Sequence, residues 1–181
     1  VVSIVMALLV VCAMGYHTID EPDMGFHLSM GRWIAAHRAV PGTDPLTFTV
    51  PDHAYIDMHW LYQVIVWLIW NTGGVRWYLI FHTLCILAAV LLSLAVAARR
   101  SNGLMFAGPL ILAGAVASEI RFSVRPEVLS WVLLMLFILI LEKHRTAVRS
   151  QLWLLPVLMT VWVNIQGIFI IGLVVIGCYA I

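Results

Sequence analysis

Long apolar segments without charged side chains are the feature that most constrains the fold of this chain. The last 31 residues, 151–181, contain no Asp, Glu, Lys or Arg. Across all 181 residues, 63% are hydrophobic and 10% are charged, whereas soluble domains average about 45–50% apolar and about 25% charged residues. This composition, with a mean hydropathy of +1.02, predicts an integral membrane protein.

The apolar runs predict an all-α, polytopic bundle of about six transmembrane helices with further helices outside the membrane. A single helix over 151–181 would extend about 46 Å, too long for a hydrocarbon core of about 30 Å, so the polar turn 164–167 is expected to divide it. The whole chain, 1–181, is interpreted as one transmembrane domain and as part of a longer polypeptide. The expected spans are 1–16, 75–98, 104–118, 128–141 and the two halves of 151–181.

A tryptophan-rich segment, 59–74, is interpreted as a helix lying in the membrane interface. Its apolar run, 60–70, would be about 16 Å long, half of what a span requires, and tryptophan favours the membrane surface. A short spanning helix remains the alternative. The expected end of this helix is the turn 71–74, before the span that begins at Val75.

Basic residues set the expected orientation. They cluster at Arg99-Arg100 and within 143–149, and such clusters favour the cytoplasmic side. The first external loop, 18–58, is then extracytoplasmic, and the protein is expected in the cytoplasmic (inner) membrane in contact with the lipid bilayer. Neither cluster has the size or interleaved aromatics of a nucleic-acid-binding surface, so we expect no nucleic-acid partner.

Six of the nine acidic residues lie in the external loop, so it is where we expect chemistry. Asp23 and His27 are spaced i, i+4 on a predicted helix that ends near His37, which places them on one face. Asp57 is well placed to cap the following helix. Two further polar groups, 119–127 and 164–166, are expected on the same side of the membrane.

The residues leave several interpretations of these polar groups open. Arg121 or Arg125 either pairs with Glu119 or Glu127 to anchor helix ends, or binds a phosphate through its planar donor fork. In the loop, Asp23 is either an acid at a helix start or a general base. A divalent metal ion is a further alternative, and its ligands would be Asp23, His27, Asp57 and His59.

Five motifs follow one another along nearly the whole chain. They are Asp23-Met24-Gly25-Phe26-His27-Leu28, Val40-Pro41-Gly42-Thr43-Asp44-Pro45, Asp57-Met58-His59-Trp60-Leu61, Arg125-Pro126-Glu127 and Trp162-Val163-Asn164-Ile165-Gln166-Gly167. This order resembles the GT-C class of polytopic glycosyltransferases, and more closely a set of bacterial multi-pass membrane proteins of the same shape.

The resemblance implies transfer of a sugar from a polyprenyl-phosphate donor to an acceptor at the outer face of the membrane. By this resemblance Asp23 is the first candidate for the catalytic base, with Glu21 or Asp20 second, and Arg121 or Arg125 would steady the departing phosphate. The supporting residues would be His27, Asp57, His59, Glu127, Asn164 and Gln166. The alternative is a non-catalytic membrane subunit that keeps this shell and docks on membrane protein partners.

Overall fold

The computed structural model describes residues 2–15, 21–49, 53–99, 106–146 and 151–180. Within these residues the chain is helical without any strand, and one isolated bridge joins Thr43 to Ala54. The all-α fold class is therefore confirmed. The elements are α1 (Val2–Gly15), α2 (Asp23–His37), α3 (Trp60–Ala97), α4 (Ala107–Ala117), the 3-10 turn η1 (Glu119–Phe122), α5 (Glu127–Thr146), α6 (Leu154–Val163), the 3-10 turn η2 (Gly167–Phe169) and α7 (Ile170–Ala180).

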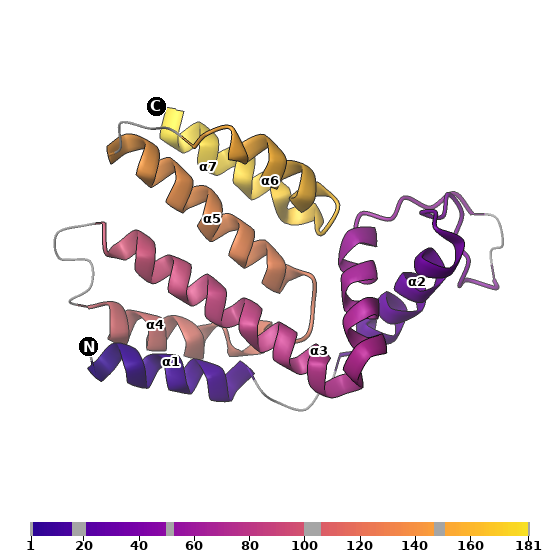
Figure 1. Ribbon diagram of the computed structural model, residues 1–181, viewed down its shortest axis with the longest axis horizontal. Coiled ribbons are helices and arrows are strands. Elements are labelled where there is room, and N and C mark those ends of the chain that lie inside the picture. The colour runs from indigo at the N-terminus through magenta and orange to yellow at the C-terminus, as the bar shows by residue number, and fades with distance from the viewer. Residues whose placement is uncertain (1, 16–20, 50–52, 100–105, 147–150, 181) are drawn as a thin grey trace.

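The helices form a bundle with one projecting arm (Figure 1). Helix α3 packs against α1 and α5, α4 lies along α1, and α6 and α7 cover the far side of α5. Buried side chains of α3, α5 and α6 make one core, in which Phe137 and Trp162 meet edge to face, and partly buried side chains of α7 pack against it. The arm consists of α2 and the beginning of α3, packed side by side.

The element α3, Trp60–Ala97, consists of two helices joined at a kink. The backbone is non-helical at Gly73 and at Gly74, where φ is +62° and ψ −151°. Glycine adopts this conformation, which other residues rarely do. The predicted end of the first helix within 71–74 is therefore confirmed, and the two halves of α3 point in different directions (Figure 1).

One described helix, α3, is both long and apolar enough to cross a membrane. Helices α1, α4 and α6 and the segment 167–180 are apolar but shorter than 18 residues. Helix α4 begins at Ala107, and its predicted start at 104 lies outside the described residues. Helix α5 extends past the predicted end at 141 to Thr146, with basic residues in its last turn, where they interact favourably with the helix dipole.

Contact between α2 and the start of α3 depends on a glycine. The buried face of α2 comprises His27, Met30, Gly31 and Ile34. A Cβ added at Gly31 would lie 2.1 Å from the carbonyl oxygen of Gln63. Glycine thus lets the two backbones approach closely enough to build the arm.

The C-terminal apolar segment is divided as predicted, by the polar turn between α6 and η2. The carbonyl of Asn164 accepts a hydrogen bond from the amide of Leu61 at 3.1 Å, and its side-chain Oδ1 accepts one from Trp60 Nε1 at 2.7 Å. The turn therefore holds the first turn of α3 and connects the bundle to the arm.

Candidate functional site

A cavity of about 330 Å³ lies where the arm meets the bundle. Its walls come from α2, from the loop before α3, from the start of α5 and from the turn before η2. The residues that line it are Asp23, Phe26, His27, Tyr55, His59, Arg125, Pro126, Glu127 and Gln166. The structure therefore brings residues of loop 18–58, Arg125 with the residues that follow it, and Gln166 of the 164–167 turn together at one site.

An ion pair between Glu21 and Arg125 joins the segment before α2 to the segment before α5. Nε and Nη2 of Arg125 donate to the two carboxylate oxygens at 2.7 and 2.9 Å. The Glu21 side chain is 3% exposed and that of Arg125 is 38% exposed. The hydrogen bonds from Arg125 lower the pKa of Glu21, and the same bonds raise the pKa of Arg125.

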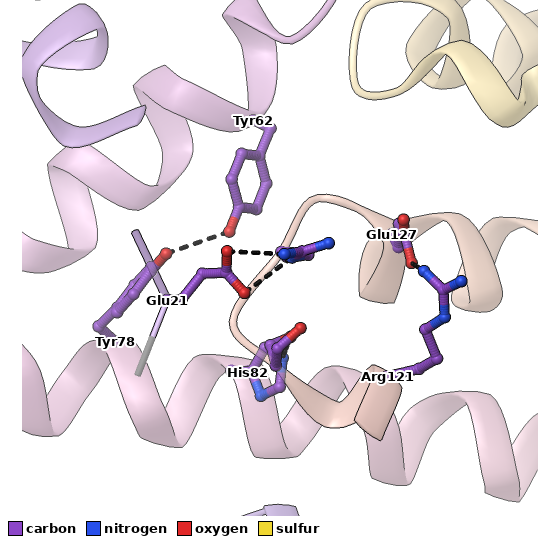
Figure 2. A network of polar contacts seen from close by, with 8 residues as sticks. Glu21, Tyr62, Tyr78, His82, Arg121 and Glu127 are labelled. Atoms are coloured by element: carbon purple, nitrogen blue, oxygen red, sulfur yellow. Dashed lines mark hydrogen bonds and ion pairs between the residues drawn. The ribbon is translucent and has the colours of Figure 1, made fainter. Parts of the chain in front are cut away.

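This pairing changes the ranking of the predicted bases. Glu21, predicted as a second candidate, has both oxygens bound to Arg125 and sits beside the Tyr62–Tyr78 hydroxyl pair (Figure 2). A carboxylate held in this way is a poor proton acceptor because its lone pairs are already engaged. Asp20, the other second candidate, lies outside the described residues.

Asp23 is in a different environment. It is the first residue of α2, it is exposed, and it lines the cavity. Within the described part of the chain, no hydrogen bond or ion pair engages its carboxylate. Of the acidic residues predicted as bases and described by the structure, Asp23 is therefore the one that lines the cavity and has no partner for its carboxylate.

The two predicted phosphate-binding arginines are in different places. Arg125 lines the cavity, whereas Arg121 does not. Arg121 lies 3.5 Å from Glu127 with 63% of its side chain exposed, and Figure 2 shows the two side chains directed at each other. The predicted pairing of Arg121 with Glu127 is thus confirmed. Nothing is described of the Glu119 side chain.

Arg125 keeps donors for a ligand despite its partner. A guanidinium has five N–H donors, and Glu21 takes one from Nε and one from Nη2. The remaining donors belong to Nη1 and to the other hydrogen of Nη2. Arg125 can therefore still donate hydrogen bonds to an anion. Because the carboxylate of Glu21 neutralises its charge, its electrostatic attraction for an anion at long range is weak.

Two histidines lie together on the cavity wall. The rings of His27 and His59 are 5.7 Å apart between centroids. His27 is buried, and burial together with the nearby His59 lowers its pKa to about 4, so His27 is neutral at neutral pH.

Gln166 fixes the tautomer of His59. Its Oε1 accepts a hydrogen bond from the Gly167 amide at 3.0 Å, which identifies this atom as the amide oxygen. The same oxygen is 2.7 Å from His59 Nε2, so Nε2 carries the proton. In the neutral imidazole, Nδ1 of His59 is then a hydrogen-bond acceptor.

Two predicted supporting residues lie behind the cavity rather than on its wall. Asn164 holds the start of α3, as described above. Asp57 is buried, and its Oδ1 accepts from the His59 amide at 2.9 Å and from Gln63 Nε2 at 3.1 Å. It therefore binds the amide of the residue that precedes α3, close to its predicted capping role. Burial is the main reason that the pKa of Asp57 is raised.

The metal-binding alternative is not supported by the geometry. Among the described residues, no group of three or more His, Cys, Asp or Glu side chains could hold a metal ion. Of the four expected ligands, Asp57 has one oxygen committed to hydrogen bonds and does not line the cavity that Asp23, His27 and His59 share. We therefore place no metal in this site.

Sequence reasoning missed the aromatic residues of the wall. Phe26 packs edge to face against His27 with centroids 5.5 Å apart, and Tyr55 lies on the segment that leads to Asp57. The position of Tyr55, two residues before the predicted capping residue, was a usable signal. The position of Phe26 gave no such signal, because it is difficult to predict which face of a helix is buried when its sequence is largely apolar.

No known protein family, curated protein or solved structure matches this chain. The function of the cavity must therefore be inferred from its own residues.

Proposed function

We propose that this chain is a polytopic membrane glycosyltransferase of GT-C-like architecture. Its cavity would transfer a sugar from a polyprenyl-phosphate donor to an acceptor hydroxyl at the outer face of the membrane. The observation that carries this proposal is the cavity itself, which is lined both by an unpaired carboxylate, Asp23, and by a partly available guanidinium, Arg125. The resemblance of the five sequence motifs supports the choice of substrate class.

The proposed step is a single displacement. Asp23 accepts the proton of the acceptor hydroxyl, whose oxygen forms a new bond to the anomeric carbon of the sugar. The bond from that carbon to the phosphate oxygen breaks, and the phosphate leaves with the electron pair. Hydrogen bonds from Arg125 stabilise the departing charge. His59 Nδ1, oriented by Gln166, is available to accept a hydrogen bond from a sugar hydroxyl.

The proposed membrane arrangement has six spans, made by α1, the second half of α3, α4, α5, α6 and α7. It places the cavity and loop 18–58 on the extracytoplasmic side, and the basic residues after α3 and α5 in the cytoplasm. Helix α5 has 20 residues and carries its charged residues at its two ends, with Glu127 in the first turn and Lys143 and Arg145 in the last. Cysteine-accessibility labelling at His53 and at Arg145 in intact cells tests this arrangement, since only the first should react from outside.

The activity is tested with the protein in membranes and a panel of polyprenyl-phosphate monosaccharides that carry a radioactive sugar. Radioactivity should leave the lipid fraction in the wild type and remain there in Asp23→Asn. The matched control is Asp44→Asn, the same change at an exposed loop aspartate whose Oδ1 accepts from the Leu46 amide and which does not line the cavity. Equal turnover in D23N and the wild type would refute the role of Asp23.

A non-catalytic subunit is the second candidate, and exposed apolar residues on the external loop favour it. Phe48 is 90% exposed and Ile56 is 87% exposed, which suits a docking surface. This candidate predicts no turnover of any lipid donor, and it predicts that Phe48→Ser abolishes co-purification of a partner while D23N does not.

A further inference from the structure

Asp57 and Gln63 form a buried pair whose hydrogen bonds are incomplete. Asp57 is 6% exposed and Gln63 is fully buried, and Gln63 Nε2 donates to Asp57 Oδ1 at 3.1 Å. The other oxygen of each side chain, Oδ2 of Asp57 and Oε1 of Gln63, is buried without a hydrogen-bond partner among the described residues. A buried polar atom without a partner costs about 1–3 kcal/mol, so two on adjacent side chains require an explanation.

The identity of the two unpaired atoms suggests the explanation. When a carboxyl group faces a primary amide, one oxygen accepts from the amide N–H and the other lies next to the amide oxygen. Two oxygens cannot bond without a hydrogen between them. If the carboxyl is protonated, its O–H supplies that hydrogen, and both unpaired atoms are satisfied by one proton.

We propose that Asp57 is held as a neutral carboxylic acid in the folded protein, with its Oδ2–H donated to Oε1 of Gln63. The result is a cyclic acid–amide pair with two hydrogen bonds, in which Oδ1 also accepts from the His59 amide. Asp57 is then a positioning residue: it joins the segment before α3 to the first turn of α3 and holds His59 at the cavity wall. In this state it is neither a base nor a metal ligand.

The surroundings of Asp57 favour the neutral form. Burial raises the pKa of Asp57 and outweighs the opposing effects of His59, on the same segment, and of the Gln63 hydrogen bond; the other titratable group that interacts with Asp57 is Tyr55, two residues earlier. From α2, His27 faces His59 and the ring of Tyr62 rather than Asp57. Helix α2 also closes over the pair, because Gly31 lies against the carbonyl of Gln63. Water that would stabilise a carboxylate is thereby excluded.

The sign of the pH dependence follows from a pKa that is raised on folding. Protonated Asp57 contributes its full stabilisation at low pH, and the contribution is lost as the pH rises through the pKa of the folded protein. Asp57→Asn carries a permanent N–H donor toward Gln63 Oε1 and keeps an oxygen for the other two bonds. It should therefore match the wild type in stability below about pH 3.9, the ordinary aspartate pKa, and exceed it increasingly as the pH rises above that value.

Infrared difference spectroscopy on the full chain in lipid tests the proposal directly. Near pH 6, about two units above the ordinary aspartate pKa of about 3.9, the wild-type spectrum should contain the carbonyl stretch of a protonated carboxylic acid that D57N lacks. Gln63→Leu should shift this band to higher frequency because the O–H loses its acceptor. Glu142→Gln, at a second buried carboxyl, should leave the Asp57 band in place.

Absence of such a band from the wild type, or its persistence in D57N, would overturn the proposal. Neither outcome depends on sugar transfer, so this test and the turnover assay of D23N fail independently.

Discussion

Replacement of Glu21 by Gln tests whether the Glu21–Arg125 pair holds the arm to the bundle. The pair joins residues 104 positions apart, through two charge-assisted hydrogen bonds of 2.7 and 2.9 Å. At a charge separation of about 4 Å and an effective dielectric constant of about 20, the Coulomb attraction is about 4 kcal/mol. Burial of the Glu21 carboxylate opposes this, and the 38% exposure of Arg125 requires a further reduction for screening by solvent.

We therefore expect E21Q to lower the free energy of unfolding by about 2 kcal/mol, within the range for hydrogen bonds to charged groups. Glu127→Gln is the matched control, because its partner Arg121 is 63% exposed and 3.5 Å away; such a pair contributes about 0–1 kcal/mol. Arg125→Lys keeps the charge but loses the bidentate geometry. Its loss in free energy of unfolding should therefore lie between those of E21Q and E127Q. Unfolding in mixed micelles, followed by tryptophan fluorescence, measures all three.

The pH dependence provides a second test of the same pair. The pKa of Glu21 is lowered from 4.5 by its hydrogen bonds with Arg125. Its stabilisation is thus complete above the pKa of the unfolded chain and is lost as the pH falls through the lower folded value. The wild type should lose stability below about pH 4.5 relative to E21Q. The role of the Glu21–Arg125 pair would be refuted if E21Q lost no more free energy of unfolding than E127Q and if the stability of E21Q and the wild type changed in parallel with pH.

Five further substitutions probe the packing that shapes the site. Gly31→Ala should destabilise the protein by about 1–3 kcal/mol, because its Cβ would overlap the α3 backbone; Gly25→Ala, with nothing within 4 Å, should be neutral or stabilising by up to about 1 kcal/mol. Gly74→Ala should cost about 1–3 kcal/mol, since φ of +62° with ψ of −151° is nearly restricted to glycine. Trp162→Phe and Ser130→Ala each break the 2.8 Å Nε1–Oγ bond at a cost of about 1–3 kcal/mol, and the double variant should cost less than their sum. Denaturation curves measure each value.

Local patterns predicted the parts of the fold that depend on local interactions. The turn residues at 71–74 identified the kink within α3, and the polar residues at 164–167 identified the break before η2. Asp57 was placed near the start of α3 because short acids favour such positions. In each case the determining contacts lie within a few residues, so the pattern contains the necessary information.

The tertiary pairings could not be predicted in the same way. Arg125 was expected to pair with a neighbouring acid or to bind phosphate, but it pairs with Glu21 on the external loop. Which of three nearby acids meets a distant arginine depends on how the arm docks, and that depends on the α3 kink and on the Gly31 contact.

The kink in α3 is the feature that turns separate polar motifs into one site. The first half of α3 is fixed to α2 through Gly31, and the second half is fixed to α1 and α5. Two interactions cross the bend: the hydroxyl groups of Tyr62 and Tyr78 lie 3.2 Å apart, and the carboxylate of Glu21 reaches Arg125 beside them (Figure 2). A straight α3 would carry the arm away from the start of α5, separating Asp23 from Arg125. The cavity therefore exists because two glycines let one helix serve both the arm and the bundle.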